Sequence, residues 1–164
     1  MTSPRRIRVL LVDDHAVLRE GLRALLETGD EGIEIAGESA TTDHGLNAAL
    51  ALRPDVVLVD LSLPGRSVPQ MIRQVREGSP KTKLIVLTAV LDELMLRETM
   101  AAGSSGYLLK DVSRRTLVAA IQDAVAGETI LHREAQKLLG IGQAPPSKDS
   151  ATWLQPLQIA ELFG

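Results

Sequence analysis

The chain has 164 residues, of which 45% are hydrophobic and 24% charged, and its formal net charge is −3 at pH 7. This length and composition fit one soluble globular domain with some additional chain, and the small negative charge gives no electrostatic case for nucleic-acid or membrane binding by the chain as a whole. Because cysteine is absent, disulfides, thiolate metal sites and cysteine nucleophiles are excluded.

The first apolar run holds only five residues before two acids interrupt it. That run is too short for a signal peptide or a membrane span. We therefore expect a cytoplasmic protein that does not associate with membranes.

Five short runs rich in leucine and β-branched residues predict β-strands. In chain order they are Ile7–Val12, Ile33–Ser39, Val56–Asp60, Leu84–Thr88 and Gly106–Lys110. After each run, apolar residues recur at three- and four-residue steps and predict a helix. The helical positions lie within 16–27, 46–52, 71–75, 94–100 and 117–125. Strands that are mostly apolar throughout indicate a parallel sheet with helices on both faces. The sequence therefore predicts an α/β domain over residues 5–130, with a doubly wound, five-stranded parallel sheet flanked by five helices.

The remaining residues, 131–164, require a separate interpretation. We expect an additional helix over 131–139, then a linker rich in glycine, proline and serine over 140–150. A short amphipathic segment is predicted over 156–163.

Charged or hydroxyl side chains mark the carboxyl ends of four predicted strands. Asp13 and Asp14 follow the first strand, whereas Asp60, Thr88 and Lys110 end the third, fourth and fifth. In a doubly wound sheet, functional groups gather beyond these ends. We therefore expect three carboxylates, a hydroxyl and an ammonium group to converge at one edge of the sheet.

This set of side chains favours metal-assisted phosphoryl chemistry. Carboxylates held close together raise one another's pKa unless a cation neutralises them, and Lys110 supplies only one positive charge. Oxygen ligands without cysteine or histidine favour Mg²⁺, which commonly completes its coordination with a phosphate oxygen. Asp60 is the expected nucleophile, forming an acyl phosphate.

Four motifs in this order resemble the receiver domain of two-component response regulators. They are DDH after the first strand, VVLVDLSLPG around the third, VLTA at the fourth and GYLLKD at the fifth. The resemblance extends from Ile7 to Gly127 and favours the NarL/FixJ (LuxR-type) class. It implies a flavodoxin-like receiver fold and a phosphorelay signalling protein rather than an enzyme.

The resemblance also implies roles for the acids and for one backbone carbonyl. Asp14 would bind Mg²⁺ directly, and Asp13 would hold it through water or support the site. Asp60 would accept a phosphoryl group from the phosphohistidine of a sensor histidine kinase. The backbone carbonyl of Ser62 would complete the protein's share of the metal ligands.

Two further residues belong to the implied switch. Thr88, together with Lys110, would hold the phosphoryl oxygens. Tyr107 stands where the family keeps an aromatic ring that moves inward when the threonine turns towards the phosphate; the alternative is a static core residue. Regulators of this class often form homodimers when active.

Two departures from the family's pattern bear on these expectations. After Pro64-Gly65 the chain reads Arg66-Ser67-Val68, so a glycine common in this loop is missing and the loop beside Asp60 is expected to differ in shape. Nothing after Ser150 has the length of a helix-turn-helix domain, so DNA binding is expected only through a domain absent from this sequence.

Two other functions stay open at this stage. One is a stand-alone receiver that acts through protein contacts alone. The other is an aspartyl-phosphate phosphatase of the haloacid dehalogenase type, which normally carries a second acid two residues after the nucleophile, where this chain has Ser62.

Overall fold

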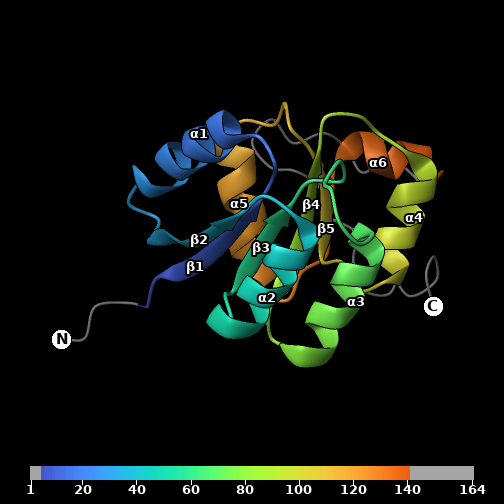
Figure 1. The fold of residues 1–164 in the computed structure, drawn as a ribbon. Coiled ribbons are helices and arrows are strands. Elements are labelled where there is room, and N and C mark those ends of the chain that lie inside the picture. Colours follow the sequence, from blue (N-terminus) through green and yellow to red (C-terminus); the bar gives the residue numbers. More distant parts are fainter. Residues whose placement is uncertain (1–4, 141–164) are drawn as a thin grey trace.

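The computed structural model describes residues 5–140, in which six strands and six helices alternate (Figure 1). The strands are β1 (Ile7–Val12), β2 (Ile33–Ser39), β3 (Val56–Val59), β4 (Lys83–Thr88), β5 (Gly106–Leu109) and β6 (Ile130–Leu131). The helices are α1 (Ala16–Glu27), α2 (Thr42–Leu52), α3 (Val68–Gly78), α4 (Glu93–Ala101), α5 (Arg114–Val125) and α6 (Arg133–Leu138).

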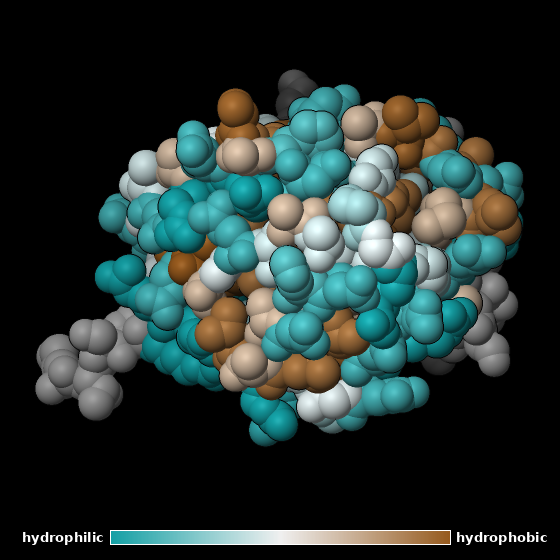
Figure 2. Space-filling model, in the orientation of Figure 1, coloured by the Kyte–Doolittle hydropathy of each residue, from teal (hydrophilic) through white to brown (hydrophobic). Residues whose placement is uncertain are grey.

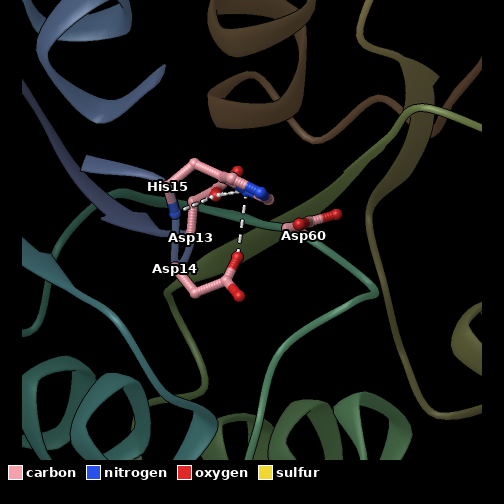
Figure 3. Close-up of side chains that lie close together, drawn as sticks. All are labelled: Asp13, Asp14, His15 and Asp60. Atoms are coloured by element: carbon pink, nitrogen blue, oxygen red, sulfur yellow. Dashed lines mark hydrogen bonds and ion pairs between the residues drawn. The ribbon is translucent and has the colours of Figure 1, made fainter. Parts of the chain in front are cut away.

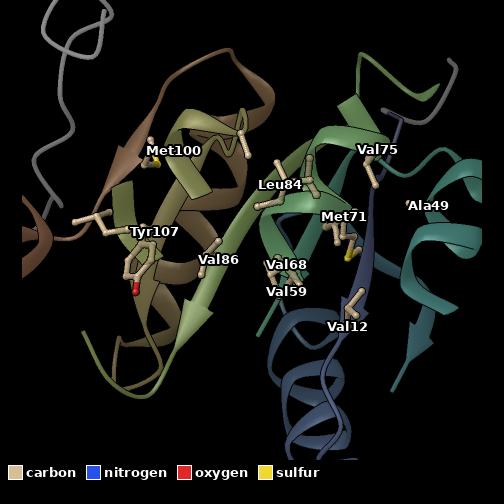
Figure 4. Packing of buried hydrophobic residues seen from close by; sticks show 14 of the residues in the cluster. Val12, Ala49, Val59, Val68, Met71, Val75, Leu84, Val86, Met100 and Tyr107 are labelled. Carbon is tan, nitrogen blue, oxygen red and sulfur yellow. The ribbon is translucent and has the colours of Figure 1, made fainter. Parts of the chain in front are cut away.

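All neighbouring strands of the single sheet are parallel, in the order β2-β1-β3-β4-β5-β6. Successive side chains of a strand point to opposite faces, and both faces are buried here. Leu10 and Val12 belong to a core that includes residues of α2, α3, α4 and α6, whereas Val9 and Leu11 belong to a second core with α1 and α5 (Figure 4 shows part of the first). Burial on both faces explains why β1 and β3 are apolar throughout.

The expectation of a five-stranded sheet is wrong by one strand within residues 5–140, whereas the sixth helix, α6, lies within the additional helix expected over 131–139. The additional strand, β6, has only two residues and pairs with Gly106 and Tyr107 of β5. Two residues are too few to show a strand pattern in a sequence. The short helix α6 follows β6 directly, so the sheet extends one strand beyond the five that were predicted.

Several helices begin at a polar side chain that accepts a hydrogen bond from the first turn. Ser67, Asp92 and Ser113 do so for α3, α4 and α5, through the amides of Gln70, Met95 and Thr116. Such a contact satisfies one of the amides that have no partner inside the helix. These caps fix where each helix starts after its strand, and hence where the intervening loops can lie.

The predicted linker beyond residue 140 and the amphipathic segment over 156–163 lie outside the described residues. Among residues 5–140, no helix is long and apolar enough to cross a membrane.

Candidate functional site

Three carboxylates meet at the carboxyl edge of the sheet (Figure 3). Asp13 and Asp14 follow β1, and Asp60 follows the neighbouring strand β3. One ligand atom from each of them, and one from His15, lie within 4.8 Å of one another. Asp13 and Asp60 are buried, at 4% and 3% exposure, whereas Asp14 is exposed. The parallel register accounts for this gathering, because Val12 pairs with Val59 and each is followed by an acid.

Lys110 brings a positive charge to the two buried acids. It follows β5, and its Nζ lies 3.1 Å from Asp13 Oδ2 and 3.2 Å from Asp60 Oδ2. Burial opposes the charged form of this ammonium group, but its interactions with Asp13 and Asp60 outweigh that effect and raise the pKa of Lys110. The lysine is therefore held as a cation between the two carboxylates.

The carboxylate of Asp13 is stabilised in its ionised form. Burial favours protonation, but the backbone amide of His15 donates to Oδ1 at 2.8 Å and Lys110 lies beside Oδ2. These donors together lower the pKa of Asp13. Asp13 is thus an anion bound to neighbouring groups on both of its oxygens.

His15 lies against both acids that precede it. Its Nδ1 is 3.1 Å from Asp13 Oδ1 and 3.0 Å from Asp14 Oδ1 (Figure 3). The only sequence signal was its position directly after the two acids. The imidazole therefore joins the polar wall of the site on its exposed side.

Arg19 is a residue of the site that the sequence reasoning missed. One of its guanidinium nitrogens donates to the backbone carbonyl of Asp13, and its Nε lies 3.2 Å from Glu38 Oε1. The backbone amide of Asp13 donates to Ser39 O at 3.0 Å. Both backbone groups of Asp13 are therefore fastened, one to α1 and one to β2. Arg19 is on α1, four residues after His15. This spacing is the only sequence signal that indicated a position near the acids.

Thr88 ends β4 and is buried, at 5% exposure. Its hydroxyl donates to Val90 O at 3.2 Å, two residues further along the same loop. In this structure the threonine is therefore engaged with its own loop rather than with the carboxylates.

Tyr107 is completely buried in the core beneath α4 (Figure 4). Burial raises the pKa of its phenol, with smaller effects from the adjacent Asp92 at the start of α4. Despite this proximity, the hydroxyl makes no well-formed hydrogen bond. A buried polar group in this state is costly and marks the position as unusual.

The loop that carries Ser62 is shaped by α2. Thr42 donates through its hydroxyl to Arg66 O at 2.7 Å and through its amide to Pro64 O at 3.1 Å. Gly65 adopts φ +108°, a conformation that favours glycine. Contacts with α2 therefore hold this loop in place beside Asp60. Ser62 itself is exposed, and its carbonyl role stays a prediction.

The residues present fit a hard divalent cation. Three carboxylates face one lysine, so the site has excess negative charge for a cation to offset. Asp60 Oδ2 is buried and accepts no hydrogen bond of good geometry, although Lys110 lies near it. Carboxylate oxygens without thiolates suit Mg²⁺.

A flavodoxin-like parallel sheet with acids after β1 and β3 and a lysine after β5 defines a receiver of the two-component type. Residues 9–122 match the family of the response regulator receiver domain, and the chain belongs to that family.

Curated relatives of this chain include a transcriptional regulatory protein and a response regulator. It is 38% identical over 132 residues to the transcriptional regulatory protein YdfI of Bacillus subtilis, covering 80% of this chain and 61% of that protein. It is 32% identical over 131 residues to the nitrate/nitrite response regulator NarL of Escherichia coli K12, covering 80% of this chain and 60% of NarL. The chain thus spans about three fifths of the length of these relatives.

Solved structures of response regulators also match this chain. A LuxR-family response regulator from Aurantimonas superposes with a TM-score of 0.75 at 29% identity, covering 80% of this chain and 94% of that one. The receiver domain of a NarL from Mycobacterium tuberculosis gives a TM-score of 0.71 at 30% identity, covering 76% and 99%.

Proposed function

We propose that this chain is a phosphorylation-switched receiver that accepts a phosphoryl group on Asp60 from the phosphohistidine of a sensor histidine kinase. The observation that carries the proposal is the setting of Asp60. Its carboxylate is buried, lies 3.2 Å from Lys110 and shares one site with Asp13 and Asp14.

The transfer is a displacement at phosphorus. An Asp60 carboxylate oxygen attacks the phosphoryl group, a P–O bond forms, the P–N bond to the donor imidazole breaks, and the electron pair returns to that nitrogen. Lys110 offsets the negative charge on the phosphoryl oxygens, as a preorganised cation beside the reacting atoms. Mg²⁺, when bound by Asp14 and Asp60 with Asp13 and the Ser62 carbonyl in support, supplies further charge neutralisation.

The proposed switch uses groups of the same site. Thr88 exchanges its bond to Val90 O for a bond to a phosphoryl oxygen, which draws the β4–α4 loop towards Asp60. Tyr107 lies beside the start of that loop's helix and packs in the space beneath it. Movement of the loop therefore changes the surroundings of the ring.

The output proposed for the longer protein is regulation of transcription through a DNA-binding domain. The support is that YdfI is a transcriptional regulatory protein and that this chain spans about three fifths of it. A homodimer formed on phosphorylation and a cytoplasmic location belong to the same proposal. A stand-alone receiver is the alternative, and the reading frame beyond codon 164 distinguishes them. The phosphatase alternative is not supported, because Ser62 stands where such enzymes need a second acid.

Acetyl phosphate labelling tests the phosphoacceptor. The wild-type chain with Mg²⁺ is expected to gain one phosphoryl group by intact mass, and the gain should disappear with EDTA and in Asp60→Asn. Asp30→Asn serves as the control because Asp30 is exposed and outside the site. Equal labelling of wild type and Asp60→Asn, or none in either, would overturn the proposal.

A further inference from the structure

A row of paired residues connects the phosphorylation site with the end of the described chain. Val59 pairs with Val86, Val86 with Tyr107, and Tyr107 with Leu131, across strands β3 to β6. Asp60 follows directly after Val59. All four side chains belong to the same buried core, so the row runs through a continuous packed layer.

β6 holds the backbone on both sides of Tyr107. Ile130 N donates to Ser105 O at 2.8 Å, and His132 N donates to Tyr107 O at 3.0 Å. Between these bonds, a Cβ on Gly106 would meet Ile130 O at 2.9 Å, which is closer than side-chain carbons normally approach. The two strands are therefore in tight backbone contact at the position of the aromatic ring.

α6 continues this contact onto α4. Ala135 and Leu139 are buried in the core that also contains Leu96 and Met100 of α4. The side-chain amide of Gln136 donates to Leu131 O at 2.9 Å and ties α6 back to β6. Figure 1 shows α6 beside one end of α4, and the shared core residues make the two helices one packed unit.

Tyr107 thus lies between the switch loop and this C-terminal unit. Its ring is fully buried, and its hydroxyl has no well-formed hydrogen bond. A packed core resists gradual deformation, so a displacement of the ring has to be accommodated by its neighbours. Its neighbours along the sheet are β4, which carries Thr88, and β6.

We propose that residues 129–140 are the output element of this receiver. In this proposal, the docking of β6 and α6 on β5 and α4 is coupled to the phosphoryl state of Asp60. The inference rests on the proposed function. The described structure combines a buried Tyr107 with a docked β6–α6 unit, and in the proposed switch the β4–α4 loop moves towards Asp60 and keeps the ring in this inward position. Phosphorylation therefore tightens the docking of α6, whose exposed face consists of Arg133, Glu134, Lys137 and Leu138.

Hydrogen exchange with beryllofluoride and Mg²⁺ tests the coupling on the full chain. The amides of Ile130 and His132 should exchange about fivefold more slowly on beryllofluoride binding. A factor of about five is the low end of the coupling usually measured between two sites of a protein. No change is expected in Asp60→Asn. The amides of β2, at the opposite edge of the sheet, serve as the internal reference.

Reciprocity supplies an independent readout, because coupled equilibria affect each other equally. Weakening the docked unit by Leu131→Val or by Ala135→Ser should lower beryllofluoride affinity by about the same fivefold factor. Leu138→Ala is the matched control, since Leu138 is on the exposed face of α6.

The possible outcomes separate the two proposals. If the wild-type chain does not bind beryllofluoride, the proposed function fails and the coupling with it. If binding occurs while the exchange at Ile130 and His132 is unchanged, or while Leu131→Val and Ala135→Ser bind as the wild type does, only the coupling is overturned.

Discussion

Lys110 Nζ lies 3.2 Å from Oδ2 of Asp60, a residue that is only 3% exposed. The same ammonium group lies 3.1 Å from Asp13 Oδ2, so it holds together the ends of three strands, β1, β3 and β5. A cation in this place both stabilises the unphosphorylated fold and prepares a position for phosphoryl oxygens.

We expect Lys110→Met to weaken beryllofluoride binding by at least about tenfold, because one charge-assisted contact to the acyl-phosphate mimic is lost. Titration followed by NMR measures the affinity. Lys81→Met is the control, since Lys81 is exposed and remote from the acids. An affinity within twofold of wild type would show that Lys110 does not contact the bound group.

The stability of the metal-free protein should depend on pH through Asp13. Its pKa is lowered from 3.8 in the folded state, so the fold favours the ionised form. The resulting stabilisation is fully present above about 3.8 and is lost as the pH falls through the folded pKa. The difference in unfolding free energy between wild type and Asp13→Asn should therefore shrink as the pH falls from about 4 to about 2. Urea unfolding in EDTA measures this difference, and a constant value over that range would contradict the assignment.

Lys110 should show the opposite dependence. Its pKa is raised from 10.5, so the fold favours its charged form. That stabilisation is present below 10.5 and is lost as the pH rises through the folded pKa. Wild type and Lys110→Met should accordingly differ by a constant unfolding free energy from neutral pH to about pH 10, with a smaller difference above it.

Arg19 should act as a positioning residue for the metal loop. It fixes the carbonyl of Asp13 and is itself held by Glu38. We expect Arg19→Gln to weaken Mg²⁺ binding by about tenfold, the low end of the loss that follows when a contact behind a metal ligand is removed. Arg19→Lys should restore only part of this affinity, because a single ammonium group cannot bridge two acceptors with the geometry of a guanidinium fork.

Arg23 offers a matched control for that experiment. It also binds Glu38, at 2.8 Å, and pairs with Glu27 at 3.0 Å, but none of its hydrogen bonds reaches Asp13. Arg23→Gln should therefore leave Mg²⁺ affinity within about twofold while affecting thermal stability as much as Arg19→Gln does. Equal loss of Mg²⁺ affinity in both variants would indicate a merely structural effect.

The sequence predicted the meeting of Asp13, Asp60 and Lys110 because strand ends of a parallel sheet share one edge. That inference needs only the strand boundaries, and these follow from strongly apolar runs. Arg19 was not predicted because it contacts a backbone carbonyl, and the residue types in the sequence give no signal for such a contact. β6 escaped notice because its two residues gain their strand conformation from pairing with β5, a tertiary effect.

The shape of the loop after Asp60 was also not predictable from the sequence. The sequence revealed a departure from the family pattern at Arg66 but not its consequence. The structure attaches the loop to α2 through Thr42, and such a contact between segments far apart in sequence has no local pattern.

Gly65→Ala should therefore lower the free energy of unfolding by more than the strain of its backbone angle alone. A Cβ there would meet Thr42 Oγ1 at 2.5 Å, in addition to the strain of φ +108°. Gly127 has φ +97° with no atom within 4 Å of such a Cβ, so Gly127→Ala reports the backbone strain by itself. We expect Gly127→Ala to cost about 1 kcal/mol in unfolding free energy and Gly65→Ala at least about 1 kcal/mol more. Equal losses would show that the Thr42 contact does not constrain the loop.

Tyr107→Phe tests whether the tyrosine hydroxyl is as isolated as the structure indicates. Replacing it removes a buried hydroxyl without a well-formed hydrogen bond while keeping the ring that fills the core. Because a buried unsatisfied polar group is costly, Tyr107→Phe should be equal to wild type or more stable by up to about 1 kcal/mol. Tyr107→Ala should instead lose about 3–5 kcal/mol, since it leaves a cavity among Val86, Met100 and Leu131. Urea unfolding measures both. A loss above about 1 kcal/mol in Tyr107→Phe would mean that the hydroxyl has a partner, with the backbone near Asp92 as the candidate.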